Sequence, residues 1–155
     1  MEELKILTKD EVLARGLEFD GEIIQYSGEY GEQVCDTSLE NKELPITGIL
    51  YEMHSNGNLN YYSYYVNGFP DGETVYFYED GSLKSYESLL NSVSHGKTVC
   101  WYENGSVKSK STSKYGITTS LLEWDENGNL VKEEYSPSEF GKRMIEKYES
   151  MEKSE

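Results

Sequence analysis

A turn signal that recurs every 23 or 24 residues constrains this chain more than any other feature. The glycines of four Asn-Gly or Asp-Gly pairs are spaced 24, 24 and 23 residues apart: Asn56-Gly57, Asp80-Gly81, Asn104-Gly105 and Asn127-Gly128. A second glycine stands nine residues upstream in three of the units, at Gly48, Gly72 and Gly96, whereas the fourth unit has Thr119 there. A fixed period indicates an array of one supersecondary unit, and the last unit of such an array is commonly atypical.

Each of these turn signals separates two segments rich in β-branched and aromatic residues. This pattern predicts a hairpin with a two-residue turn and positive φ at both central positions. Further turn signals, in residues 67–72 and 91–96, connect one hairpin to the next. We therefore expect an antiparallel meander with eight strands at roughly 49–54, 59–66, 73–79, 83–90, 97–103, 107–113, 119–126 and 129–135.

Alignment of the repeats predicts that one face of the sheet is packed and that the other is partly exposed to solvent. Two columns, three and five positions after the first glycine, are apolar in every unit: Tyr51, Val75, Val99 and Leu122, then Met53, Phe77, Trp101 and Trp124. Side chains two positions apart on a strand lie on the same side of the sheet, so both columns share a face. The columns between them are mixed and begin with Glu52 and His54.

Helix signals flank the repeats. Thr8 and Glu11 form a predicted capping box, and Gly16 is placed to end a short helix. Near the other end, Ser136 is the expected N-cap, with Pro137 in the first turn. An apolar stripe at helical spacing follows, which fits either a lid over the end of the sheet or a partner-binding helix: Phe140, Met144, Tyr148 and Met151.

The expected fold class is therefore mainly all-β. It is an open, single-layer antiparallel β-meander of hairpin repeats with short flanking N- and C-terminal α-helices. We divide the chain into an acidic segment at 1–44, four repeats at 45–135 and a capping helix at 136–155. The first segment has strand signals at Ile23-Ile24 and Val34-Cys35, which fit an eroded first repeat.

The charge restricts the partners. With 29 acidic and 14 basic side chains the formal charge is −15, which disfavours nucleic acid because phosphate binding depends on Lys and Arg. Residues 1–48 hold 12 acidic and 4 basic side chains and are the most acidic part. The chain has no apolar run of eighteen residues and no secretory leader pattern, and Cys35 and Cys100 lack CxxC spacing. These features predict no membrane span, a cytoplasmic location and reduced thiols.

The sequence also lacks the residue combinations that catalysis requires. His54 and His95 occupy different repeat positions, and Cys100 stands in a strand column that Glu and Tyr occupy in the sister repeats. The acid pairs lie at turns or strand ends without EF-hand spacing. No P-loop, GxGxxG or HExxH motif occurs. We therefore expect no enzyme activity, no cofactor and no metal site.

Tyrosine is the dominant aromatic residue, with 14 Tyr against 4 Phe and 2 Trp. The run from Tyr61 to Tyr65 places aromatic rings on both faces of one strand. We expect an exposed aromatic platform edged by carboxylates as the partner-binding surface, formed by Tyr62, Tyr64, Tyr76, Tyr78 and Tyr102 with Glu52, Glu79 and Glu103. The alternative is that cross-strand aromatic ladders only stabilise a thin sheet.

The repeats resemble a known group. The resemblance rests on Pro45-Ile46-Thr47-Gly48-Ile49-Leu50-Tyr51, Asn56-Gly57-Asn58-Leu59, Asn67-Gly68, Asp71-Gly72-Glu73, Tyr76-Phe77-Tyr78 and Asp80-Gly81-Ser82-Leu83-Lys84. Over about residues 45–135 these residues look like the bacterial variant of the MORN repeat. They are similar to the YwqK-type antitoxin family of toxin–antitoxin systems.

The resemblance implies an antitoxin or immunity protein that neutralises a toxin by binding it. It implies a twisted single-layer sheet without catalytic residues, and an acidic, Tyr-rich face would suit a basic toxin domain. A general MORN-repeat scaffold or a membrane-associated adaptor stays open as the alternative. A homo-oligomer is also open, because the edge strands of such a sheet are free to pair.

Overall fold

The computed structural model describes residues 4–28 and 31–154. The elements in chain order are α1 (Lys9–Arg15), β1 (Leu17–Glu18), β2 (Ile24–Ser27), β3 (Gln33–Asp36), β4 (Leu44–Pro45), β5 (Gly48–Met53), β6 (Leu59–Val66), β7 (Phe69–Phe77), β8 (Leu83–Leu90), β9 (Val93–Trp101), β10 (Val107–Lys114), β11 (Ile117–Trp124), β12 (Leu130–Glu134) and α2 (Glu139–Lys153).

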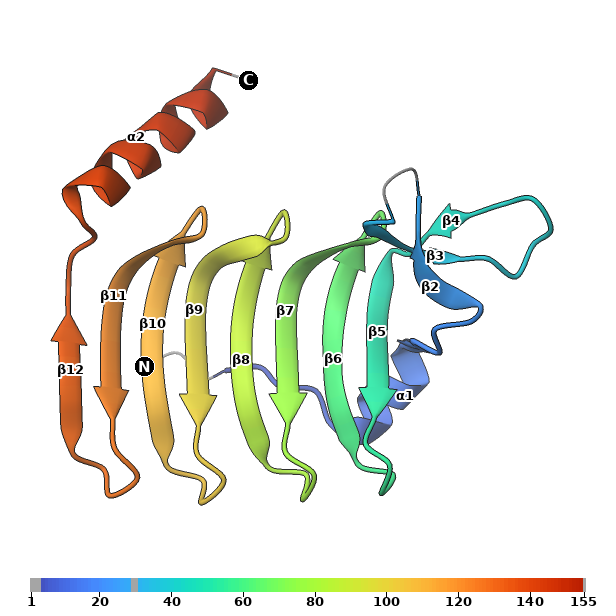
Figure 1. Ribbon diagram of the computed structural model, residues 1–155, viewed down its shortest axis with the longest axis horizontal. Coiled ribbons are helices and arrows are strands. Elements are labelled where there is room, and N and C mark those ends of the chain that lie inside the picture. The colour runs from blue at the N-terminus through green and yellow to red at the C-terminus, as the bar shows by residue number, and fades with distance from the viewer. Residues whose placement is uncertain (1–3, 29–30, 155) are drawn as a thin grey trace.

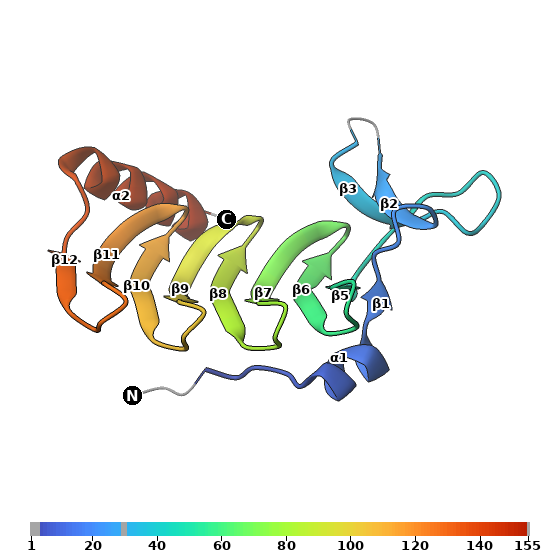
Figure 2. The ribbon, with the colours of Figure 1, turned by 60° about the horizontal axis from the view of Figure 1, so that its bottom comes forward.

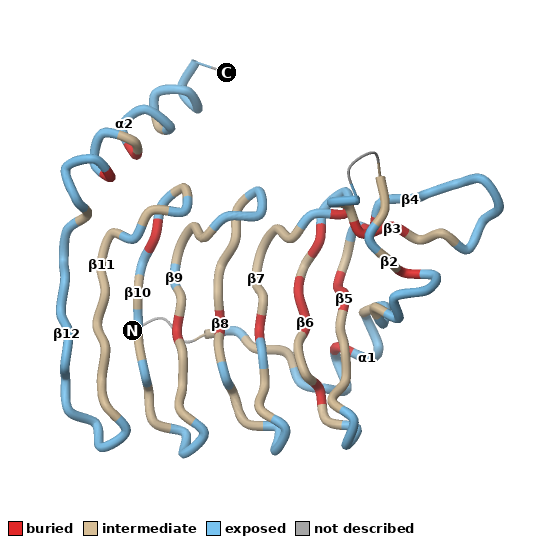
Figure 3. Tube along the Cα trace, viewed as in Figure 1, coloured by how far each residue is buried: buried red, intermediate tan, exposed pale blue. Residues whose placement is uncertain are grey.

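The repeats form one long antiparallel meander. Strands β5 to β12 lie side by side in chain order, and β1 adds a short parallel strand at the β5 edge (Figure 1). The opposite edge is β12, which no strand of the described chain covers and which is exposed throughout (Figure 3). The predicted fold class, an open mainly-β meander with a short helix at each end, is confirmed.

The two ends of the sheet use different turns, and the expected turn type is wrong at the Asn-Gly and Asp-Gly positions. There only the glycine has positive φ, as at Gly57 (φ 90°) and Gly81 (φ 91°). Gly57 N–H donates to His54 O at 3.0 Å, which closes a type I turn followed by a left-handed glycine. Two-residue turns with positive φ at both positions lie at the opposite end instead, at Asn67-Gly68, Asn91-Ser92 and Tyr115-Gly116. Because these connections are short, β7 and β9 begin four residues earlier than expected.

The upstream glycines of the repeat are bulge positions. Gly72 and Gly96 lie inside β7 and β9 with φ of 108° and 117°. The register with the preceding strand shifts beside each of them. A Cβ at Gly72 would stand 3.1 Å from Tyr64 Cβ. Bulges bend the strand that carries them, and the strands curve along their length in Figure 2.

One face of the sheet is packed under the N-terminal segment. We call it the inner face and define it by the cross-strand row Tyr62, Val75, Tyr86 and Val99. The segment runs across this face toward α1, and Leu4, Ile6 and Leu7 pack on its core (Figures 1 and 2). The predicted capping box of α1 is present, and the Gly16 N–H donates to Val12 O at the other end of the helix. Val12 is fully buried and anchors α1 to the sheet.

The other face, which we call the outer face, carries the row Glu52, Tyr61, Tyr76, Ser85 and Cys100. Strands β2, β3 and β4 form a separate small sheet and do not extend the meander. Its Ile24 and Val34 pack with Leu50 and Tyr65 in a second core cluster. The outer face is thus covered at β5 and the adjoining part of β6.

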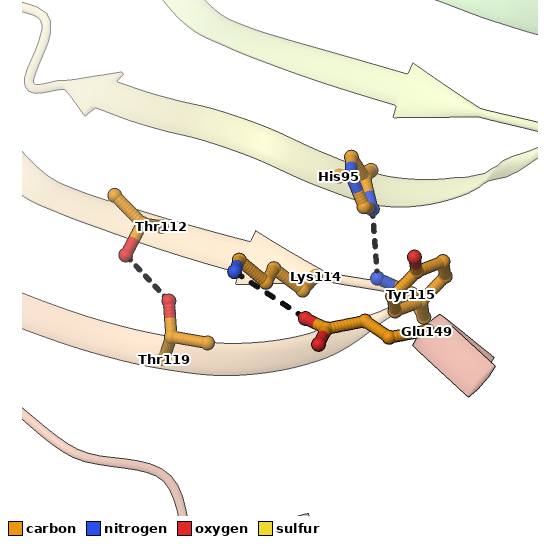
Figure 4. Close-up of polar contacts among 6 residues, drawn as sticks. All are labelled: His95, Thr112, Lys114, Tyr115, Thr119 and Glu149. Atoms are coloured by element: carbon orange, nitrogen blue, oxygen red, sulfur yellow. Dashed lines mark hydrogen bonds and ion pairs between the residues drawn. The ribbon is translucent and has the colours of Figure 1, made fainter. Parts of the chain in front are cut away.

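Helix α2 packs on the strand ends near the Tyr115-Gly116 turn. The Tyr148 ring stacks on the Tyr115 ring, with ring centres 5.2 Å apart. Figure 4 shows the ion pair of Lys114 with Glu149, at 3.6 Å. The Tyr115 N–H donates to His95 Nδ1 at 3.0 Å, which joins this turn to β9.

Two details of the expected C-terminal helix are wrong. Its N-cap is Ser138, which accepts a hydrogen bond from the Gly141 N–H, and Ser136 lies outside the helix. The buried positions of α2 are Gly141 and Ile145. Phe140 and Met151 of the predicted stripe are exposed instead.

Candidate partner-binding surface

Tyrosines at the strand ends tie one repeat to the next. Tyr78 donates its hydroxyl hydrogen to Trp101 O at 2.7 Å, and Tyr102 does the same to Trp124 O at 2.8 Å. His54 holds the equivalent place in the first repeat, where its Nε2 lies 2.9 Å from Phe77 O. These side chains therefore have a structural role in the ladder, as the alternative interpretation of the tyrosines expects.

A lysine of the same repeat lies over the ring of each of these two tyrosines. Lys84 Nζ lies 5.6 Å from the centre of the Tyr78 ring, and Lys108 Nζ lies 5.7 Å from that of Tyr102. Glu79 and Glu103, predicted as edge carboxylates, are exposed in the adjacent turns. The carbonyl oxygen of Glu79 also accepts hydrogen bonds from Asn56 and Asn58 of the preceding repeat.

The expected exposed platform does not form, because its members lie on opposite faces. Tyr62 and Tyr64 are on the inner face, and Tyr62 is 1% exposed beneath the N-terminal segment. Its hydroxyl oxygen accepts a hydrogen bond from the Leu7 N–H at 2.9 Å. Tyr76 is on the outer face and is 41% exposed. Partner binding by the predicted residues stays a prediction, but Tyr62 and Tyr76 are not available on one surface.

The structure brings a different set of tyrosines together on the outer face. Tyr61 and Tyr76 are cross-strand neighbours on β6 and β7, with ring centres 5.3 Å apart. Beside them, Ser63 and Thr74 form a second row with a 2.5 Å hydrogen bond between their hydroxyls. These two rows form the floor of a cleft of about 420 Å³.

The small sheet supplies one wall of this cleft. Tyr26 on β2 lines it together with Phe19, and the two rings meet edge to face at 5.5 Å. Tyr65 on β6 also lines it. Burial is the main reason that the pKa of Tyr65 is raised to about 12. We call the space enclosed by these residues the outer cleft.

Two carboxylates line the outer cleft. Glu52 on β5 lies near the Tyr61 hydroxyl, and Glu87 on β8 accepts a hydrogen bond from Ser94 Oγ at 2.8 Å. Burial is the main cause that raises the pKa of Tyr61, and Glu52 adds to the shift. The pKa of Tyr76 is raised by burial, and the charges of Glu52 and Glu87 add to the shift. Neither carboxylate forms an ion pair within the described residues, so the outer cleft is aromatic and negatively charged.

The inner face has a second hollow where the N-terminal segment begins. This inner groove has a volume of about 430 Å³. Apolar side chains dominate its lining, together with two lysines: Leu4, Val99, Trp101, Val107, Leu122, Tyr135, Lys97 and Lys110. Its lining among residues 4–28 and 31–154 includes no acidic residue, in contrast to the outer cleft.

Sequence reasoning found part of the outer cleft and missed the rest. Glu52 and Tyr76 share a repeat column, and that column correctly places both on one face. Tyr61 and Glu87 could have been added by following the alternation along β6 and β8. Tyr26 comes from a segment outside the repeat, so the period of 24 residues carries no information about it.

Two further features, a metal site and a membrane-spanning helix, are not found among the described residues. Within residues 4–28 and 31–154 no cluster of three or more His, Cys, Asp or Glu side chains is arranged to hold a metal ion. No helix among those residues is long and apolar enough to cross a membrane.

The geometry defines a class of protein: an open sheet of stacked hairpins, in which side chains at fixed repeat positions bond each hairpin to the next. The repeat unit itself then matches the family model of the MORN repeat variant, over residues 70–91 and 94–115. These stretches correspond to the hairpins β7–β8 and β9–β10. The chain is thus a MORN-like repeat protein. No curated protein and no solved structure was found to match it.

Proposed function

We propose that this chain is a non-catalytic binding protein, and specifically the antitoxin or immunity partner of a basic toxin domain in the cytoplasm of a bacterium. The observation that carries the proposal is the outer cleft, where four tyrosines and two unpaired carboxylates meet on one face. Tyr is enriched where proteins bind one another, since it contributes a large rigid ring and a hydroxyl. A carboxylate-lined surface favours a partner of opposite charge.

The net charge of the chain also favours a basic partner. A net charge of −15 speeds the encounter with a basic protein at low ionic strength. The first 48 residues contribute most of it, and part of that segment forms the wall of the outer cleft. Phe19 and Tyr26 come from that segment.

A growth assay tests the proposal. The reading frames on either side of this gene are each expressed alone and together with it, and each pair is examined by size-exclusion chromatography. We expect one neighbouring product to inhibit growth alone, to lose that effect on co-expression and to co-elute with this chain. If no neighbour is toxic, or if a toxic neighbour is unaffected by this chain, the antitoxin proposal is wrong.

The inner groove favours a second candidate function, a membrane-associated adaptor. Its apolar lining with Lys110 at its side is the type of surface that meets anionic lipid, although far fewer lysines gather there than in typical lipid-binding clusters. Membrane binding is measured by sedimentation with vesicles of phosphatidylcholine that contain about 30% phosphatidylserine. The assay is run at two salt concentrations that differ about tenfold, because salt screens the attraction between lysine and anionic lipid. Binding at low salt that Lys110→Glu abolishes would favour the adaptor, and no sedimentation would exclude it.

A further inference from the structure

We propose that the outer cleft is a binding site for a single cationic side chain, an arginine of the partner, which stacks on Tyr76 and is attracted by the carboxylates of Glu52 and Glu87. This inference rests on the proposed function for the basic character of the partner. It goes further in naming the site, the group that enters it and the residues that hold it.

The aromatic lining is the first observation. The rings of Tyr61 and Tyr76 form the floor, and Tyr26 and Tyr65 stand beside them. A cation placed over the face of a tyrosine is attracted by the negative charge of the ring face. Tyr76 is 41% exposed, so part of its ring is accessible from solvent.

Two other tyrosines of the sheet give the second observation, because a lysine of the chain already lies over each of them. Lys84 lies over Tyr78, and Lys108 lies over Tyr102. Among the described residues, those that line the outer cleft are neutral or acidic and include no lysine or arginine. A cation from outside would make with these tyrosines the type of contact that Lys84 and Lys108 make elsewhere on the sheet.

The carboxylates give the third observation. Glu52 and Glu87 line the same cleft and form no ion pair within the described residues. A cation that enters the cleft is attracted by both charges. Ser94 Oγ donates a hydrogen bond to Glu87 at 2.8 Å, so this carboxylate is held in place before a ligand arrives.

The geometry favours arginine over lysine. A guanidinium is planar, so it stacks on a tyrosine ring while its N–H groups remain free to donate in the plane to carboxylates. An ammonium is a strongly hydrated point charge and cannot stack. The outer cleft, with a floor of rings and carboxylates at its sides, matches the flat cation.

The test uses two tripeptides that differ only in charge: acetyl-Gly-Arg-Gly-amide and the same peptide with neutral citrulline in place of arginine. Binding is followed by NMR titration of the full chain. We expect the arginine peptide to bind at least about fivefold more tightly than the citrulline peptide. We also expect Glu52→Gln with Glu87→Gln to remove at least about fivefold of its affinity.

A matched control separates the site from the general acidity of the chain. Glu79→Gln with Glu103→Gln changes the net charge by the same amount in exposed turns away from the outer cleft. We expect less than about twofold loss for this pair. A second variant, Tyr76→Leu, keeps an apolar side chain but removes the ring, and we expect it to weaken the arginine peptide and leave citrulline unaffected.

Equal affinity for the two peptides, or equal losses in the two glutamine pairs, would overturn the inference. Thermal unfolding of each variant shows whether a loss reflects misfolding, in which case Tyr76→Leu and the glutamine pairs would all lower Tm. The growth assay is independent of this result. Arginine binding without toxin neutralisation would refute the antitoxin proposal alone, and neutralisation that survives the Glu52 and Glu87 substitutions would refute the arginine site alone.

Discussion

The hydroxyl oxygen of Tyr62 accepts a hydrogen bond from the backbone N–H of Leu7, 55 positions earlier in the chain, at 2.9 Å. This bond fixes the N-terminal segment to the inner face of the sheet. It also explains why Tyr62, within a tyrosine run that looks two-sided in the sequence, is buried on the inner face. The partner-binding surface that we propose lies on the opposite, outer face.

The Tyr62 bond gives the first prediction. Tyr62→Phe leaves the Leu7 N–H without its acceptor, and we expect the free energy of unfolding to fall by about 1 to 2 kcal/mol in urea denaturation. Tyr64→Phe is the matched control, because the described residues show no hydrogen bond to the Tyr64 hydroxyl. Equal effects of the two substitutions would contradict the assigned role of the Tyr62 hydroxyl.

The inter-repeat tyrosines give the second prediction. Tyr78→Phe and Tyr102→Phe each remove one hydrogen bond to the next repeat, and we expect each to cost about 0.5 to 1.5 kcal/mol of unfolding free energy. The two bonds lie in successive repeats and do not share a partner. The double variant should therefore be additive within about 0.5 kcal/mol. If the double variant is as stable as the single variants, the two hydrogen bonds do not contribute independently to stability.

The bulge glycines give the third prediction. Gly72→Ala places a methyl group 3.1 Å from Tyr64 Cβ at a φ of 108°, and we expect a loss of about 2 to 3 kcal/mol from strain and crowding together. Gly48→Ala is the control, since φ there is 136° with no atom within 4 Å of the added carbon. The Gly48→Ala substitution measures the cost of the backbone conformation alone, and we expect it to lower the free energy of unfolding by about 1 to 2 kcal/mol. Melting curves that rank Gly48→Ala as the more damaging would contradict the crowding.

The buried tyrosines give a prediction about alkaline pH. Burial is the main reason that the pKa values of Tyr62 and Tyr65 are raised to about 12. A tyrosine of the unfolded chain ionises near pH 10. A raised pKa in the folded state adds stability that is complete below pH 10 and is lost as the pH rises toward 12. We expect unfolding free energy to fall across that window, and absorbance at 295 nm to show a late-titrating class of tyrosines. A single titration near pH 10 with the fold intact would contradict this.

The repeat period predicted the meander because each strand had to bury the same apolar columns. Val75 and Phe77 lie on the inner face as their columns require, as do Val99 and Trp101. The turn types were harder to predict, because Asn-Gly is compatible both with a two-residue turn and with a type I turn closed by glycine. The observed turns at Asn91-Ser92 and Tyr115-Gly116 contain residues that are uncommon at positive φ.

The candidate site was only partly predictable for a related reason. Alternation assigns residues to two faces but does not say which face another segment covers. Tyr62 and Tyr76 were grouped because both are aromatic and close in the meander, whereas the N-terminal segment buries the first and leaves the second exposed. The contact of Tyr26 with this surface depends on packing between segments that have no common period.

The central claim is that cationic ligands bind on the outer face, and NMR of labelled tyrosine rings tests it most directly. The chain is prepared with ¹³C-labelled tyrosine, and signals are assigned by single Tyr→Phe variants. On addition of acetyl-Gly-Arg-Gly-amide we predict shifts for the rings of Tyr26, Tyr61 and Tyr76 and no change for Tyr62 and Tyr86 on the inner face. Shifts confined to Tyr62 and Tyr86, or no ring shift at saturating peptide, would contradict the account.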